Sequence, residues 1–328
     1  LRLVRAQRDV ASITEVLRGT LAGLSDELME IRRDLHAHPE LAGNEVRTTS
    51  VVANRLIAAG IRVRLLTGSG LVADIGPVDP AYRVALRADL DALPVAERTG
   101  LPFTSLNDGV CHACGHDVHI AAVLGAGLAL HRHLDSLAAP GTGVRLIFQP
   151  AEEVIPGGAQ RVIEEGGIEG VDAIFSIHCD PTLDVGQVGL RHGPLTAAAD
   201  GVTITLSGRG GHTARPHLTQ DLTYALAKVI TDVPAVLSRR VDPRAGVALV
   251  WGSVHSGSAH NVIPSPGPVR GTLRMPDAQV WDEIRPPLEA VVRPRVTPCA
   301  ASLQRARLPW GPPFATRPGR SQCLRPSP

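Results

Sequence analysis

Short apolar runs and longer amphipathic stretches alternate along the first part of the chain. Leu28, Ile31 and Leu35 recur at helical spacing after Ser25, which can cap a helix that should stop at Pro39. Further helices are predicted at about 45–59, 119–134 and 158–165, and strands at 61–66, 71–75, 82–89, 144–150 and 171–178. Helices that alternate with strands in this way predict an α/β sheet with parallel members.

The pattern changes near residue 190. The stretch GVTITLSGRGGH (201–212) alternates apolar and polar positions, as a half-exposed strand does. A helix at about 219–238, strands near 246–252 and 268–274, and a helix at about 277–292 should follow. This order predicts a smaller α+β domain inserted after the first domain.

These patterns divide the chain into four parts. They are an N-terminal extension (1–24), a larger domain (25–190), a smaller domain (191–292) and a tail (293–328). The tail holds eight prolines, seven arginines and no Asp or Glu. That composition is typical of disorder, and it also resembles a coding sequence read out of frame. We therefore expect no regular structure after residue 292.

Composition limits the classes of function. The apolar fraction of 44% and the mean hydropathy of +0.07 are typical of a globular protein without a membrane span. Residues 1–19 lack the apolar core of a secretory signal, and five cysteines without regular spacing favour a reducing compartment, so we expect a cytoplasmic protein. The net charge is +1, and without its basic tail the chain is mildly acidic, so no nucleic-acid-binding surface is expected.

Three polar clusters come directly after predicted strands. They are RADLD (87–91), QPAEE (149–153) and HCD (178–180). In open α/β sheets, ligands bind outside the carboxyl ends of the strands. We therefore expect one crevice to gather the side chains Asp89, Asp91, Glu152, Glu153 and His178, together with the loop CHACGHDVH (111–119).

The CHACGHDVH loop can be interpreted in several ways. Haem attachment is excluded because Gly115 stands where the histidine of C-x-x-C-H must be. A zinc ribbon is excluded because it needs a second C-x-x-C, which the sequence lacks. A redox dithiol of Cys111 and Cys114 stays open, but it leaves the neighbouring histidines and glutamates without a role. A catalytic metal site uses Cys114 and His116 as donors, together with Glu153 and His178.

The adjacent Glu152 and Glu153 suit such a site. Neighbouring residues can point in different directions, so one carboxylate can bind metal while the other stays free beside a water molecule. A metal lowers the pKa of bound water toward ~7, and a free carboxylate can accept its proton. This pairing indicates a hydrolase.

Seven segments in order resemble the M20 metallohydrolase family, and in particular its amidohydrolase branch of N-acyl-amino-acid, hippurate and auxin-conjugate hydrolases. The segments are RRDLHAHPELAGNE (32–45), ALRADLDALPVAE (85–97), CHACGHDVHIA (111–121), FQPAEE (148–153), IFSIHCDP (174–181), GRGGHTARPH (208–217) and SAHNVIPSPGPVRGTLR (258–274). The resemblance implies a zinc-peptidase-like α/β catalytic domain with an inserted α+β lid that can mediate dimerisation. It also implies hydrolysis of the amide bond of an N-acyl amino acid or a related small-molecule conjugate.

The resemblance assigns roles to individual residues. The metal ligands would be Cys114, which would bridge two metals, and His116, Glu153 and His178. Glu152 would be the general base, and His212 in the lid would stabilise the oxyanion, with Asn261 and Arg274 in segments that bind substrate. Asp89 and Asp91 are expected to orient ligands from behind. Thiolate, imidazole and carboxylate donors permit two divalent ions, which could be Zn²⁺, Mn²⁺, Co²⁺ or Ni²⁺.

The sequence departs from the family near its end. The family returns to the catalytic domain after the lid and supplies a last histidine ligand there, whereas this sequence has no histidine after His260. We interpret this as truncation or a frameshift and expect weak or absent turnover. Two alternatives stay open, namely a metallo-exopeptidase or dipeptidase of the same superfamily and an inactive truncated homologue.

Overall fold

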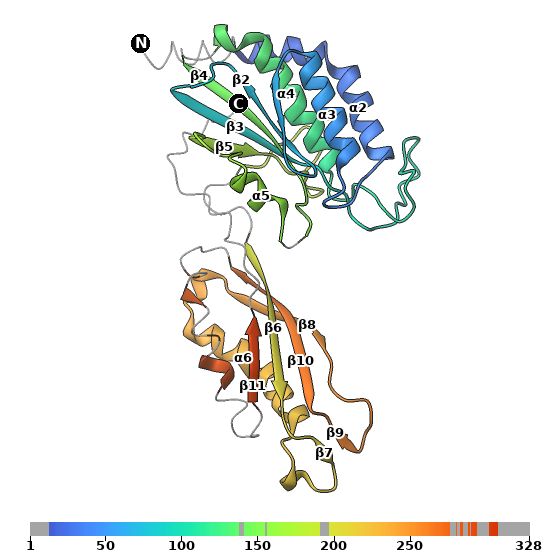
Figure 1. Ribbon diagram of the computed structural model, residues 1–328, viewed down its shortest axis with the longest axis vertical. Coiled ribbons are helices and arrows are strands. Elements are labelled where there is room, and N and C mark those ends of the chain that lie inside the picture. The colour runs from blue at the N-terminus through green and yellow to red at the C-terminus, as the bar shows by residue number, and fades with distance from the viewer. Residues whose placement is uncertain are drawn as a thin grey trace. The chain divides into compact units, whose positions relative to one another are not determined.

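The computed structural model describes residues 13–137, 141–154, 156–190, 197–275 and 302–307, together with 280, 283–284, 288 and 290–293. The chain divides into two compact units, Leu1–Val185 and Gly186–Pro328 (Figure 1). Each unit has its own hydrophobic core.

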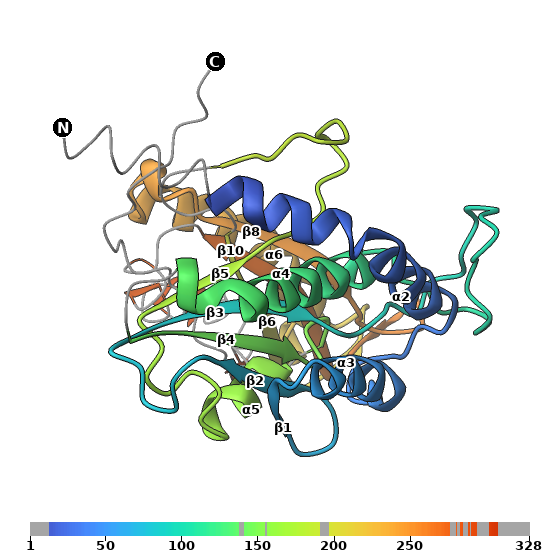
Figure 2. The ribbon, with the colours of Figure 1, turned by 90° about the horizontal axis from the view of Figure 1, so that it is seen from above.

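A five-stranded mixed sheet forms the centre of the first unit. Its strands are β1 (Arg62–Leu65), β2 (Leu71–Ile75), β3 (Tyr82–Asp89), β4 (Thr142–Gln149) and β5 (Ala173–Ser176), in the order β1-β2-β4-β3-β5 (Figure 2). The β3 strand pairs in parallel with both β4 and β5, while β1 and β2 are antiparallel. The prediction of an α/β sheet with parallel members is confirmed.

Helices cover both faces of this sheet. On one side in Figure 1 lie α2 (Ser25–Ala37), α3 (Val46–Ala58) and α4 (His116–Leu137), and α5 (Gly158–Glu164) lies on the other. The side chains of β4 alternate between the two cores, because Leu146 and Phe148 join the α2–α4 core while Ile147 packs with Val162 of α5. Burial on both faces explains why the three residues 146–148 of β4 are all apolar. A further helical stretch covers residues 13–22.

The strand directions place the polar loops at one edge of the sheet. The three parallel strands end at Asp89, Gln149 and Ser176, and the segments that carry the predicted site residues follow directly. Helix α4 begins at His116, three residues before the predicted start, after Gly115 with a φ of 80°. His116 therefore lies in the first turn of a helix and not in the loop before it.

The second unit contains a four-stranded antiparallel sheet. The strands β6 (Ala198–Ser207), β8 (Ala248–Val254), β10 (Pro266–Met275) and β11 (Ser302–Arg307) take the order β11-β6-β10-β8. Helix α6 (Leu222–Arg240) packs its apolar side on this sheet. A two-stranded ribbon of β7 (Gly211–His212) and β9 (Val262–Ile263) and two 3₁₀ turns, η1 (Pro216–Leu218) and η2 (Pro243–Ala245), complete the unit.

Strand β11 corrects the expectation for the tail. Ser302–Arg307 contains no proline and pairs antiparallel with β6, so these six residues have regular structure although the surrounding composition predicts none. Pairing with the edge of a sheet is a tertiary contact that composition does not report. Apart from Arg293, the rest of the tail lies outside the described residues, as does much of the helix predicted at 277–292.

The helices within the described ranges include none with an apolar stretch able to cross a membrane.

We expect Gly158→Ala to destabilise the turn that leads into α5. A Cβ atom at this position would lie 2.0 Å from the carbonyl oxygen of Pro150, and a backbone atom cannot rotate away. The substitution should lower the free energy of unfolding by about 1–3 kcal/mol, as overpacking does. Gly19→Ala is the matched control, because its Cβ meets nothing within 4 Å in a helical stretch and should stabilise by about 1 kcal/mol. Denaturant titration measures both, and equal unfolding free energies would contradict this reading of the turn.

Candidate metal centre

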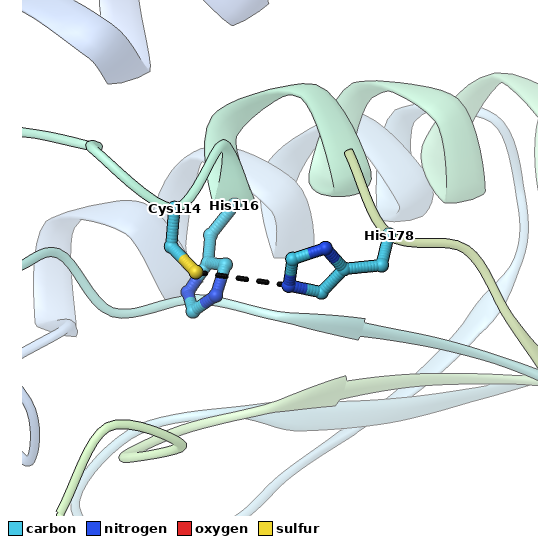
Figure 3. Close-up of side chains that lie close together, drawn as sticks. All are labelled: Cys114, His116 and His178. Atoms are coloured by element: carbon cyan, nitrogen blue, oxygen red, sulfur yellow. Dashed lines mark hydrogen bonds between the residues drawn. The ribbon is translucent and has the colours of Figure 1, made fainter. Parts of the chain in front are cut away.

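Three side chains from two distant parts of the first unit meet at the edge where the parallel strands end. Cys114 precedes α4, His116 opens that helix, and His178 follows β5. Their donor atoms lie within 4.8 Å of one another, with 3.7 Å between Cys114 Sγ and His178 Nε2 (Figure 3). The structure thus brings three of the predicted ligands together.

Both histidines are held in the same tautomer. Nδ1 of His116 lies 2.7 Å from the carbonyl oxygen of Asp91, and Nδ1 of His178 lies 2.7 Å from that of Cys179. A carbonyl oxygen only accepts hydrogen bonds, so each Nδ1 carries the proton and each Nε2 keeps a lone pair. This is the arrangement that protein histidines adopt when Nε2 binds a metal.

Two of the metal-donor atoms at this edge of the sheet belong to the buried side-chain atoms that have no hydrogen-bond partner. They are Nε2 of His116 and Oε1 of Glu153, which face each other at 3.7 Å. Two ligands at 2.0–2.3 Å from one tetrahedral ion lie about 3.3–3.8 Å apart. Buried polar atoms are normally hydrogen-bonded, so this unpartnered pair, with a thiol and a second imidazole beside it, fits a divalent cation.

Glu152 lies beside these donors. One of its carboxylate oxygens falls within 4.8 Å of donor atoms of His116 and Glu153. The Glu152 side chain is exposed, whereas Glu153 is partly buried. Partial desolvation, followed by the charges of Glu153 and Asp89, raises the pKa of Glu152 above its ordinary value. A carboxylate with a raised pKa and access to solvent is suited to accept a proton.

Asp91 supports the centre from behind. It is buried, its carbonyl accepts from His116, and its Oδ2 accepts the backbone N–H of Glu153 at 2.9 Å. Burial alone would raise the pKa of Asp91, but hydrogen bonds from His116 and from the Glu153 backbone lower it, so the carboxyl stays ionised. The buried charge then favours a cation next to it.

His119 is a contributor that the sequence analysis left out. It is fully buried, its Nδ1 donates to Oδ1 of Asp89 at 2.7 Å, and its Nε2 accepts the backbone N–H of Cys179 at 2.9 Å. With both ring nitrogens engaged, His119 is not an open donor, but it fixes the segment that carries His178. Its spacing of three from His116 on one helix is a signal in the sequence that could have placed both on one face.

The carboxylates around Cys114 oppose its ionisation. Partial burial, a hydrogen bond to Glu153 and the charges of nearby carboxylates raise the pKa of the Cys114 thiol to about 12. Burial lowers the pKa of His116, but hydrogen bonds to Asp91 and the charges of Asp89 and Asp91 raise it overall. The Cys114 thiol therefore keeps its proton until a metal ion displaces it.

The remaining predicted residues lie in the second unit. His212 on β7 is exposed and lies close to Asn261, whose carbonyl oxygen accepts the backbone N–H of Thr213 at 3.1 Å. Arg274 is exposed near the end of β10. The roles of these three residues at the metal centre stay predictions.

The chain is similar to known proteins over most of its length. The sequence model described as peptidase family M20/M25/M40 matches residues 85–274. A Bacillus subtilis N-acetyl-L-cysteine deacetylase is 40% identical over 296 residues, which cover 89% of this chain and 70% of that protein. A Rhodococcus jostii protein that carries a glutamate–cysteine ligase name is 45% identical over 300 residues, which cover 91% of this chain but only 37% of that longer protein.

A solved structure has a similar fold. The Bacillus subtilis YXEP protein, described as a dinuclear metal-binding peptidase of the M20 family, superposes with a TM-score of 0.73 at 32% identity. The match covers 88% of this chain and 74% of that protein.

Binding of a metal by Cys114 must release the thiol proton. Because the pKa of this thiol is raised to about 12, it is protonated at pH 8, and we expect Co²⁺ to release about one proton more from the unchanged chain than from Cys114→Ala. Cys111→Ala removes a buried thiol of the same loop and should leave the count unchanged. Calorimetric titration in buffers of different ionisation enthalpy counts the protons. The same count for Cys114→Ala and the unchanged chain would rule out Cys114 as a thiolate ligand.

Proposed function

Because the chain belongs to peptidase family M20/M25/M40, we propose that it is a metal-dependent amidohydrolase that cleaves N-acyl amino acids or related conjugates. The observation that carries the proposal is the unpartnered pair of His116 Nε2 and Glu153 Oε1, with the carboxylate of Glu152 beside it. The likeness to the N-acetyl-L-cysteine deacetylase supports the substrate class.

In this proposal Cys114, His116, Glu153 and His178 would hold the metal. A bound divalent cation supplies Lewis acidity, which polarises the amide carbonyl and lowers the pKa of water toward ~7. The mixed donor set is compatible with Zn²⁺, Mn²⁺, Co²⁺ or Ni²⁺. The description of the YXEP protein as dinuclear supports two ions.

Glu152 carries out the proton transfers. It accepts a proton from the attacking water as the oxygen bonds to the amide carbon, and it delivers that proton to the nitrogen when the C–N bond breaks. The products are a carboxylic acid and an amino acid, and Glu152 returns to its starting state. The raised pKa of Glu152 brings its affinity for a proton closer to the affinities of the attacking water and of the leaving nitrogen, with which it exchanges that proton.

The second unit supplies further groups in this proposal. His212 would donate a hydrogen bond to the carbonyl oxygen as that oxygen gains negative charge. Arg274 would bind the substrate carboxylate with two hydrogen bonds, and Asn261 would contact the substrate nearby. We also propose that this unit mediates a homodimer and that the protein is cytoplasmic, since its cysteine pattern favours a reducing compartment.

The peptidase alternative is supported by the description of the YXEP protein as a peptidase. Turnover of N-acetyl and N-benzoyl amino acids, measured beside turnover of dipeptides with each metal, separates the two activities. Faster hydrolysis of the dipeptides would establish the peptidase. If the metal-loaded chain cleaves neither class, the inactive-homologue alternative holds.

Glu152→Gln tests the assignment of the base. The amide cannot accept the proton, so we expect the turnover number to fall about a hundredfold to ten-thousandfold, while bound metal measured by mass spectrometry stays unchanged. Glu164→Gln, at an exposed glutamate of α5, is the matched control and should keep full activity. In the unchanged chain, kcat/KM should fall as the pH drops through the Glu152 pKa, because the base must be ionised. Full activity of Glu152→Gln would refute the mechanism.

A further inference from the structure

Ala151 has an unusual backbone conformation next to the proposed base. Its φ is 49°, and it is the only residue other than glycine with a positive φ in the described part of the chain. The Cβ atom disfavours this left-handed region. Ala151 is also buried, so water does not hold it there. Other groups in the protein must therefore hold Ala151 in this conformation. Because Ala151 directly precedes Glu152, these groups act on the backbone next to the proposed base.

Glu45 supplies the contact that fixes it. This carboxylate is fully buried at the start of α3, and its Oε1 accepts the backbone N–H of Ala151 at 2.7 Å. Its Oε2 accepts the hydroxyl of Ser69 at 2.6 Å, which fixes the rotation of the carboxylate. Glu45 is 106 residues away from Ala151 in the sequence, so the contact exists only in the folded chain.

A second buried carboxylate holds the other side of Glu152. Oδ2 of Asp91 accepts the backbone N–H of Glu153 at 2.9 Å, and the carbonyl of Ala151 accepts the N–H of Gly158 at 2.8 Å. The backbone is thus anchored one residue before and one residue after Glu152. Anchors at both positions fix the directions in which the side chains of Glu152 and Glu153 leave the backbone.

We propose that Glu45 is a positioning residue, which holds Ala151 in the left-handed conformation and thereby separates the free carboxylate of Glu152 from the ligating carboxylate of Glu153. The proposal rests on the proposed function, because it assigns Glu45 to the geometry of that reaction. Glu45 touches neither substrate nor metal in this account and acts only through the backbone of Ala151.

Removal of the carboxylate should affect catalysis more than substrate binding. We expect Glu45→Ala in the full metal-loaded chain to lower kcat about tenfold to a hundredfold, the range of a displacement near 1 Å, while KM changes less than about threefold. Glu45→Gln should keep most of the activity, because its Oε1 can still accept the N–H of Ala151. Where Glu45→Ala does not fold, Glu45→Asp takes its place, since the shorter side chain withdraws the carboxylate from Ala151.

Glu40→Ala is the matched control. Oε1 and Oε2 of Glu40 accept the backbone N–H groups of Arg47 and Thr48, so this variant loses two hydrogen bonds at the start of the same helix. It should lower stability and leave kcat within about threefold of the unchanged chain. If Glu40→Ala and Glu45→Ala lowered kcat equally, the effect of Glu45→Ala would come only from a less stable α3. That result would overturn the proposal.

A second substitution at Ala151 gives an independent test. Glycine adopts a positive φ without a steric penalty, so Ala151→Gly should restore part of the kcat lost in Glu45→Ala. It should not improve Glu40→Ala. Absence of any recovery in the Glu45→Ala, Ala151→Gly double variant would contradict a role that passes through the Ala151 backbone.

Co²⁺ affinity separates this proposal from the proposed function. Glu153 follows the same turn, so Glu45→Ala should weaken Co²⁺ binding at least about threefold, Ala151→Gly should recover it, and Glu40→Ala should leave it unchanged. A chain that hydrolyses no N-acyl amino acid but shows these changes refutes the function and retains the positioning role. A chain that turns over substrate, with kcat and Co²⁺ affinity insensitive to Glu45→Ala, retains the function and refutes the positioning role.

Discussion

The candidate centre depends on two hydrogen bonds from histidine rings to backbone carbonyls. His116 donates through Nδ1 to Asp91, and His178 donates through Nδ1 to Cys179, so both rings present the Nε2 lone pair to the same space. Cys114 and Glu153 reach that space as well, and Nε2 of His116 and Oε1 of Glu153 are buried there without partners. These two atoms are costly to bury unless a cation satisfies them.

The fold produces this arrangement through the directions of its strands. The strands β3, β4 and β5 run parallel, so the segments after Asp89, Gln149 and Ser176 meet at one edge of the sheet, where α4 also begins. Carboxylates behind the donors then fix the backbone, as Asp91 does for Glu153 and Glu45 does for Ala151. The geometry of the loops is thus imposed by two buried acidic side chains, one after β3 and one at the start of α3.

Most elements and the convergence of the site were accessible from the sequence, because they follow from local periodicity and from the rule for parallel strand ends. The structure confirmed the sheet and showed Cys114, His116 and His178 together. His119 and Glu45 were not identified, since their importance comes from burial and from partners 30 and 106 residues away. Strand β11 was missed for a similar reason, because pairing with β6 outweighs a local composition typical of disorder.

The most direct test is anomalous diffraction from a crystal of the full chain loaded with Zn²⁺ or Co²⁺. The account predicts at least one anomalous peak within about 2.0–2.5 Å of Nε2 of His116 and of a carboxylate oxygen of Glu153. It also predicts Cys114 Sγ and His178 Nε2 as ligands of the bound metal, with the Glu152 carboxylate uncoordinated. A metal-loaded crystal without a peak between these side chains, or with Glu152 as a ligand in place of Glu153, would contradict the account.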